Sequence, residues 1–215
     1  MLIRSVASLL GSTLLAGCSV VGVRAGTEQP KYEVVARPAE GVEVRQYGNR
    51  IAAEVTVSRG RRGANENAAF GALAGYIFGK NQTRTDIDMT SPVESRTSEK
   101  IAMTAPVETA STEQSMTMRF YLPSEYTLED VPKPLNPKVA IIPISSATIA
   151  TLKFSGLRSS TNVATHTAQL LERLDGTSWT VTGEPVAYFY DPPWTVPNLR
   201  RNEIAVTVEK QDEAT

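Results

Sequence analysis

Few residues in this sequence could carry out chemistry, and their numbers exclude several kinds of site. The 215-residue chain has one cysteine, Cys18, and one histidine, His166. One histidine rules out any site that needs two imidazoles, which removes the common zinc-hydrolase sites. A Ser-His-Asp triad could use only His166. Carboxylate pairs at a telling spacing, nucleophile motifs and phosphate-binding glycine loops are absent from the sequence. We therefore predict that the protein is not an enzyme, and we name no catalytic residue or metal ligand.

The segment before Cys18 suggests that this cysteine has a role other than catalysis or metal binding. Arg4 precedes an apolar run over residues 6–15, and a run of about ten residues suits a signal peptide but is too short to span a bilayer. Leu-Ala-Gly stands directly before Cys18, which resembles a bacterial lipobox, the motif in which the cysteine receives a lipid anchor. We predict a lipoprotein signal peptide over residues 1–17 and a lipidated tether over residues 18–30. The alternative is an ordinary secretory signal with a chance cysteine.

The residues after Cys18 indicate where the protein resides and what it contacts. Ser19 follows the cysteine, and serine at this position favours transport to the outer membrane. We expect a lipid-anchored envelope protein that faces the periplasm, with a folded domain over residues 31–210 and a polar tail over residues 211–215. The net charge of −1 leaves no basic excess for phosphates, so we predict no nucleic-acid partner.

Two helices and several strands are predicted from the spacing of apolar residues. Alternating apolar and polar residues predict strands on both sides of each helix. The first helix is predicted to have Asn65 as its N-cap and Gly79 just after its end, and the second helix to end at Asp175. The order strands, helix, strands thus occurs twice, as two β-α-β-β halves of the ferredoxin-like kind. We predict an α+β fold, a distorted pseudo-twofold β-barrel built from these halves with two flanking helices.

Four stretches of the sequence carry a resemblance to a known family. They read GYIFGKN, KIAMTAPVET, MRFYLPSEYTLEDVPKPLNPKV and YDPPWTVPNLRRNEIAVTV. These stretches resemble the SOUL haem-binding proteins, over about residues 32–209. The resemblance implies a distorted β-barrel flanked by two helices, in agreement with the periodicity. It also implies that haem or a related tetrapyrrole is bound in an apolar cleft beside the first helix, near the loop before the last strand.

A candidate haem site can be assembled from residue types near these segments. Haem needs an apolar slot and cations for its propionates. The candidates are the helix residues Phe70, Leu73, Ala74 and Ile77, then Met103, Tyr190 and Trp194, and the cations Arg61, Arg200 and Arg201. The alternative is that the aromatic residues only pack and the arginines are solvated. His166 is expected at a half-exposed surface position, so we predict haem as a ligand without a strong axial protein ligand.

An unusual phrase, Ile-x-Met-Thr-x-Pro-Val-Glu, occurs at residues 87–94 and again at residues 101–108. We predict two short strands of one hairpin, with Met89 and Met103 at equivalent positions. Methionine is flexible and fills irregular gaps, so both are expected in the core under the first helix. The alternative is that one sulfur faces the bound porphyrin.

Four functions remain open at this point. The first is a tetrapyrrole-binding protein that acts as a carrier or buffer, anchored to the membrane through Cys18. The second is a binding module for other apolar small molecules or lipids, because paired ferredoxin-like halves also occur in multidrug-sensing domains. The third is an enzyme acting on tetrapyrroles, and the fourth is a structural envelope lipoprotein.

Overall fold

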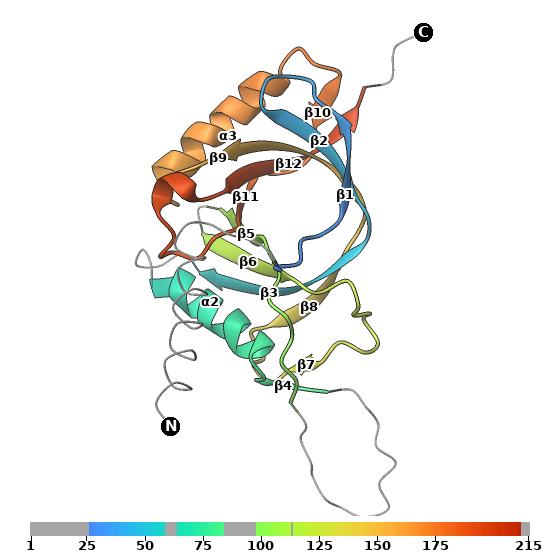
Figure 1. The fold of residues 1–215 in the computed structure, drawn as a ribbon, viewed down its shortest axis with the longest axis vertical. Coiled ribbons are helices and arrows are strands. Elements are labelled where there is room, and N and C mark those ends of the chain that lie inside the picture. Colours follow the sequence, from blue (N-terminus) through green and yellow to red (C-terminus); the bar gives the residue numbers. More distant parts are fainter. Residues whose placement is uncertain (1–25, 59–63, 84–97, 113, 212–215) are drawn as a thin grey trace, which may run out of the picture.

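The computed structural model describes residues 26–58, 64–83, 98–112 and 114–211 (Figure 1). Cys18 with the signal peptide, Arg61 and the first of the two phrases with Met89 lie outside these residues. Within the part of the chain that is described, no helix is both long enough and apolar enough to cross a membrane.

Strands make up much of the described chain. They are β1 (Tyr32–Ala36), β2 (Val42–Tyr47), β3 (Arg50–Ser58), β4 (Asn81–Gln82), β5 (Val107–Ser111), β6 (Ser115–Tyr121), β7 (Lys133–Pro134), β8 (Ala140–Ile144), β9 (Ala147–Phe154), β10 (Trp179–Val181), β11 (Val186–Phe189) and β12 (Asn202–Lys210). One ten-stranded sheet follows the order β1-β2-β9-β12-β11-β5-β6-β3-β8, with β10 beside β12. All its pairings are antiparallel, and β4 pairs separately with β7. The sheet curls into an open, distorted barrel (Figure 1).

The order of the strands has an internal twofold symmetry. β2, β3, β5 and β6 of the first half correspond to β8, β9, β11 and β12 of the second half, and exchanging the two sets leaves the order of neighbours unchanged. The symmetry centre lies between β5 and β11, where Glu108 is opposite Tyr188. The halves are interlocked, because β2 pairs with β9 and β3 pairs with β8. The predicted pseudo-twofold barrel is therefore confirmed.

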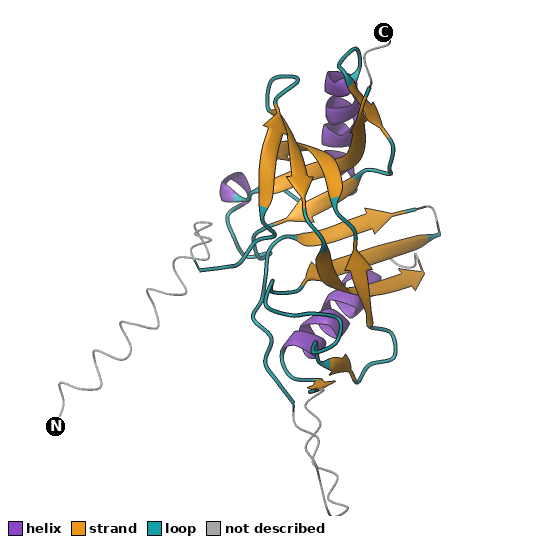
Figure 2. Ribbon diagram, turned by 90° about the vertical axis from the view of Figure 1, so that its right-hand side faces the viewer, coloured by secondary structure: helices purple, strands orange, loops and turns teal. Residues whose placement is uncertain are grey.

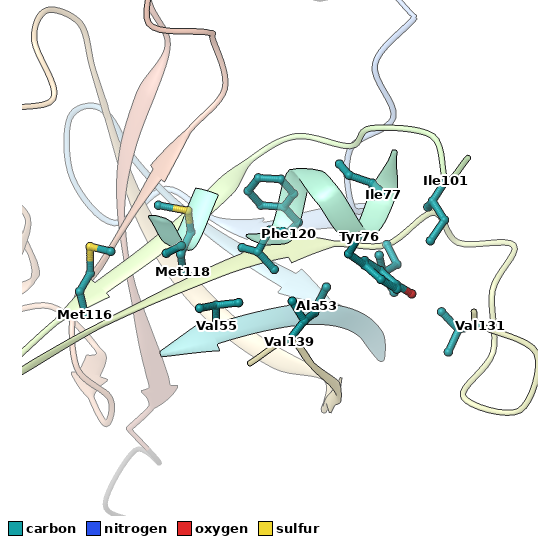
Figure 3. Close-up of a cluster of buried hydrophobic side chains, with 13 residues drawn as sticks. Ala53, Val55, Tyr76, Ile77, Ile101, Met116, Met118, Phe120, Val131 and Val139 are labelled. Atoms are coloured by element: carbon teal, nitrogen blue, oxygen red, sulfur yellow. The ribbon is translucent and has the colours of Figure 1, made fainter. Parts of the chain in front are cut away.

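The helix of the first half, α2 (Ala64–Ile77), packs on the outer face of β3 and β6. Leu73, Tyr76 and Ile77 are buried in one apolar cluster with strand residues such as Val55 and Phe120. Figure 3 shows side chains of α2, β3 and β6 pointing toward one another in this cluster. The helix ends at Ile77, and Gly79 just beyond it has a φ of 105° that lets Lys80 N–H reach the Gly75 carbonyl at 2.8 Å.

The helix of the second half, α3 (Ser160–Leu174), covers the equivalent outer face. The Ser159 hydroxyl accepts a hydrogen bond from Asn162 N–H at 3.2 Å, which caps the helix start. Leu170 and Leu174 are buried against β9 and β12 residues such as Leu152 and Val206. Figure 2 shows the two helices on two groups of strands, one above the other.

Two local predictions from the sequence are wrong. Asn65 is not an N-cap, because it lies inside α2 and its side chain donates a hydrogen bond to the Ser58 carbonyl. The second phrase is not a strand over its whole length, because β5 begins only at Val107, directly after Pro106. Proline has no N–H to donate to a strand ladder. Met103 stands before this strand and is 47% exposed, so it is not in the core.

Candidate functional site

The inner face of the barrel carries tyrosines and charged residues where the outer face carries aliphatic ones. Successive residues of a strand point to opposite faces, so on β12 Ile204 joins the core under α3 while Ala205 joins an inner cluster. Tyr47, Tyr188 and Tyr190 belong to the same inner cluster. The interior of this barrel is thus lined by groups that can form hydrogen bonds.

Glu203 is the centre of a buried ion-pair network on this face. Its side chain is 0% exposed, and its carboxylate accepts hydrogen bonds from Arg45 at 2.7 Å and from Arg201 at 2.7 Å. Tyr190 donates a third bond, at 2.7 Å. Burial alone would raise the pKa of Glu203, but the hydrogen bonds and charges of both arginines hold it below its ordinary value. Glu203 is therefore an anion at neutral pH, and the two arginines are its counter-charges.

The same network decides the role of Tyr190. Burial, followed by the charge of Glu203, raises the pKa of the Tyr190 phenol, so this hydroxyl stays protonated. The Arg201 guanidinium lies 3.9 Å from the centre of the Tyr190 ring. Both residues are thus engaged on the inner face of the sheet, although the sequence placed them in a haem site beside the first helix.

A second carboxylate, Glu108 of β5, is neutralised in a similar way. Arg119 donates to Glu108 at 2.6 Å and to Glu54 at 2.5 Å. The Tyr121 hydroxyl also donates to Glu108. Burial raises the pKa of Tyr121, and the nearby Tyr188 and Glu108 raise it further, so Tyr121 acts as a donor.

Arg50, at the start of β3, differs from these arginines. Its guanidinium lies over two rings, 4.5 Å from the centre of Tyr47 and 5.0 Å from that of Tyr121. Its Nε is buried and has no hydrogen-bond partner. No ion pair of Arg50 is found among the described residues. A buried donor without a partner costs about 1–3 kcal/mol, so an unpaired Arg50 needs an explanation.

Arg50 also lines a cavity of about 820 Å³. The walls come from the segment before β1, the turn between β2 and β3, the segment after β6 and the end of β8. Apolar groups include Ile51, Leu122 and Ile144, and no wall residue comes from α2. Sites for small molecules have volumes of about 300–1,000 Å³, so this cavity has the size of a ligand site.

The helix residues predicted to form a haem slot have two different environments. Leu73 and Ile77 are buried in the core between α2 and the sheet, and Ala74 is half-buried. Phe70 is 41% exposed and packs edge-on against Phe120, with ring centres 5.4 Å apart. Of the four, Phe70 has the large exposed apolar surface that a flat ligand could cover.

The loop before β12 supplies the remaining predicted residues. Trp194 is 65% exposed, so much of this residue is accessible to solvent. Arg200 donates to the carbonyls of Thr195 at 2.8 Å and of Pro193 at 2.6 Å, so it stiffens this loop. A short helical turn, η1 (Pro197–Leu199), ends the loop.

Arg158 connects this loop with α2, and sequence reasoning did not find it. Its guanidinium donates to the Asp191 carbonyl and lies 5.0 Å from the Phe189 ring centre, while its Nε is buried without a partner. Burial, followed by the neighbouring charge of Arg200, lowers the pKa of Arg158. Glu66 of α2 is also close enough for its charge to act on Arg158. Arg158 and Arg200 therefore form a pair of cations near the start of α2.

The predicted site residues are thus separated by the fold. Phe70 of α2 lies on the outer side, Trp194 and Arg200 belong to the neighbouring loop, and Tyr190 with Arg201 faces inward. Neither Arg158 nor Arg50 stands in a motif that could have marked it in the sequence. Their roles depend on neighbours that are distant along the chain.

The single histidine of the sequence is engaged on the second helix. His166 lies on α3, where its ring stacks on Phe154 with centres 4.2 Å apart. Its Nδ1 is 2.8 Å from the Asn162 carbonyl oxygen. Among the residues that the structure describes, no group of three or more His, Cys, Asp or Glu side chains could hold a metal ion.

Comparison with known families decides the identity of the domain. The family model described as SOUL heme-binding protein matches residues 27–207, which is most of the chain. This protein belongs to the SOUL family. SOUL proteins form a family of binding proteins, and the match includes every element from β1 to most of β12. No curated protein matches the sequence of this SOUL protein.

Solved structures with the same fold are distant in sequence. The C-terminal domain of EcmrR is 13% identical with a TM-score of 0.53, covering 83% of this SOUL protein and 98% of that chain. A hydrolase from Listeria innocua is 10% identical with a TM-score of 0.55, covering 80% and 93%. An uncharacterized conserved protein from Listeria innocua is 12% identical with a TM-score of 0.51, covering 86% and 94%. At these identities the likeness shows a common fold alone.

Proposed function

We propose that this SOUL protein is a lipid-anchored envelope protein that binds haem or a related tetrapyrrole and acts as a carrier or buffer. Membership of a haem-binding family supports the ligand class. The observation that carries the location is the cation pair Arg158 and Arg200, because both arginines donate hydrogen bonds to carbonyls of the loop that carries the exposed Trp194. Two cations next to exposed aromatic rings suit a flat apolar ligand with two carboxylates.

In this proposal the ligand lies between Phe70 of α2 and the loop that carries Trp194. Each of these rings offers apolar area that a porphyrin would remove from water. Arg158 and Arg200 are the partners of the propionates in this arrangement. His166 is engaged by Phe154 and Asn162 on α3, so the iron receives no ligand from it. Hydrophobic contact then supplies most of the affinity, which suits a carrier that must release its ligand.

A haem titration tests this function. The protein lacking residues 1–18 is expected to bind haem one to one, as a saturable change in Soret absorbance. The double variant Phe70→Ala/Trp194→Ala should bind at least about 10-fold more weakly, because each lost ring removes apolar contact. Both positions are exposed, so the variant is expected to fold.

The control for this titration is Phe78→Ala, which removes another exposed ring just beyond the end of α2. It should bind haem like the wild type. Equal affinity of the double variant and the wild type would place haem away from these two rings. The absence of saturable binding by the wild type would contradict the haem function itself.

The lipid anchor has its own test. In a bacterial host the full-length protein is expected to sediment with membranes and to enter the detergent phase, because a diacyl anchor on Cys18 holds it there. Cys18→Ala should appear in the soluble periplasmic fraction or remain as unprocessed precursor. If the substituted protein partitions like the wild type and is processed normally, Cys18 is not the anchor.

A further inference from the structure

We infer that the 820 Å³ cavity beside Arg50 is a second ligand site, which binds an apolar molecule carrying one carboxylate. This site goes beyond the proposed haem function, because its walls share no residue with α2 or with the loop over residues 191–201. Arg50 is the anchor of the carboxylate. The inference stands on the position of Arg50, its missing partner and the chemistry of the walls.

Arg50 is held in place before any ligand arrives. Its guanidinium contacts the rings of both Tyr47 and Tyr121, and Arg50 lines both the large cavity and a small one of about 10 Å³. Stacked rings cover the faces of a guanidinium and leave its edge, which carries the N–H donors. A planar edge of this kind matches the two oxygens of a carboxylate.

The charge of Arg50 is not neutralised by the carboxylates around it. Glu108 is bound by Arg119 and Tyr121, and Glu203 is bound by Arg45 and Arg201. On the cavity wall, Glu28 accepts a hydrogen bond from Ser124 N–H at 2.9 Å and Glu129 is a second carboxylate, and neither forms an ion pair with Arg50 among the described residues. A bound anion would therefore give Arg50 the partner that the described residues do not supply.

The rest of the cavity indicates what the anion is attached to. Near Arg50 the walls present aliphatic and proline side chains, namely Pro30, Ile51, Leu122, Pro123, Pro143 and Ile144. Such walls favour an apolar body. The other basic wall residue is Lys31, which is exposed, so the cavity is not built for a polyphosphate. An apolar monocarboxylate, such as a fatty acid or an aromatic acid, fits both features.

The inference is tested with two fluorescent probes that differ only in the head group, 1-pyrenebutyrate and the neutral 1-pyrenebutanol. The soluble chain without residues 1–18, which contains every described residue, should bind pyrenebutyrate saturably and more tightly than pyrenebutanol. Arg50→Gln should weaken pyrenebutyrate about 10- to 100-fold, because it removes a charge-assisted contact, and should leave pyrenebutanol within about threefold. Arg37→Gln, an exposed arginine away from the cavity, is the matched control and should change neither.

A second variant keeps the test valid if Arg50→Gln folds poorly. Leu128→Trp enlarges a partly exposed wall residue and should weaken both probes by narrowing the cavity. The inference would be overturned if the wild type bound the two probes with equal affinity. It would also be overturned if Arg50→Gln bound pyrenebutyrate as tightly as the wild type does. Haem added at saturation should leave pyrenebutyrate bound. If haem displaces the probe and Arg50→Gln weakens haem equally, the cavity is the tetrapyrrole site and a separate site is ruled out.

Discussion

The Glu203→Gln variant is expected to lose about 3–5 kcal/mol of its free energy of unfolding relative to the wild type. The side chain of Glu203 is fully buried and neutralises Arg45, whose own side chain is almost fully buried. Removing the anion takes from Arg201 its counter-charge and leaves Arg45 only the partly exposed Glu43, with the two guanidinium groups close together. Urea unfolding at pH 7 measures this loss, which also corresponds to a drop in melting temperature on the order of 10 °C.

Glu43→Gln is the matched control for this variant. Glu43 also pairs with Arg45, at 2.8 Å, but its side chain is about one-third exposed. Exposed ion pairs contribute about 0–1 kcal/mol, so the same substitution should cost far less here. If the two variants lose equal stability, the buried network is not what holds the inner face together.

The same network makes stability depend on pH in a defined direction. Burial raises the pKa of Glu203, but the opposing hydrogen bonds and charges of Arg45 and Arg201 prevail, so the folded-state pKa lies below the unfolded value of about 4.3. The stabilisation from Glu203 is thus complete above the unfolded pKa and is lost as the pH falls through the folded pKa. Unfolding curves between pH 7 and pH 3 should show this loss in the wild type. The glutamine variant lacks this contribution, so its stability should fall less over the same range.

Leu73→Ala is expected to cost about 2–5 kcal/mol, because it opens a space in the core between α2 and the sheet. Leu73 is 0% exposed and belongs to the cluster that contains Val55 and Phe120. Chemical unfolding of the variant and the wild type measures the difference. The sequence instead predicted that Leu73 lines an open haem slot, in which case its loss would mainly weaken ligand binding.

Leu171→Ala provides the comparison for this substitution. Leu171 is the same residue type in the other helix, and it is 38% exposed. Its replacement should cost less than about 1 kcal/mol. A cost below 1 kcal/mol for Leu73→Ala as well, together with weaker haem binding, would support the slot and contradict the buried position.

The structure shows where alternating residues correctly predict a buried face and where they do not. Met116, Met118 and Phe120 alternate with polar residues along β6, a pattern that indicates one apolar face, and these three residues pack together under α2. Met103 was predicted from an equally regular phrase, yet it is exposed. The difference is Pro106, which interrupts the strand ladder, so β5 begins only at Val107. The residues before Pro106 belong to no strand, and their alternation therefore does not place Met103 on a buried face.

By itself, the sequence determined the elements, the twofold order of the barrel and the family. These depend on local spacing and on motifs that are contiguous in the chain: the period of two in strands, the stripe of apolar residues in each helix and the glycine after α2. The candidate signal peptide and lipobox are read from contiguous residues in the same way. These patterns can be recognised without knowing which segments of the chain contact one another in the fold.

Only the tertiary structure decided which charges are paired and which remain available. Arg45 and Glu203 are 158 residues apart in the chain, and their contact exists because β9 pairs with both β2 and β12. Arg200 and Arg201 are adjacent, yet one holds the loop and the other faces Glu203. Whether the charge of an arginine is paired depends on its neighbours in space. Only the assembled barrel therefore distinguishes Arg50 and Arg158 from the other arginines.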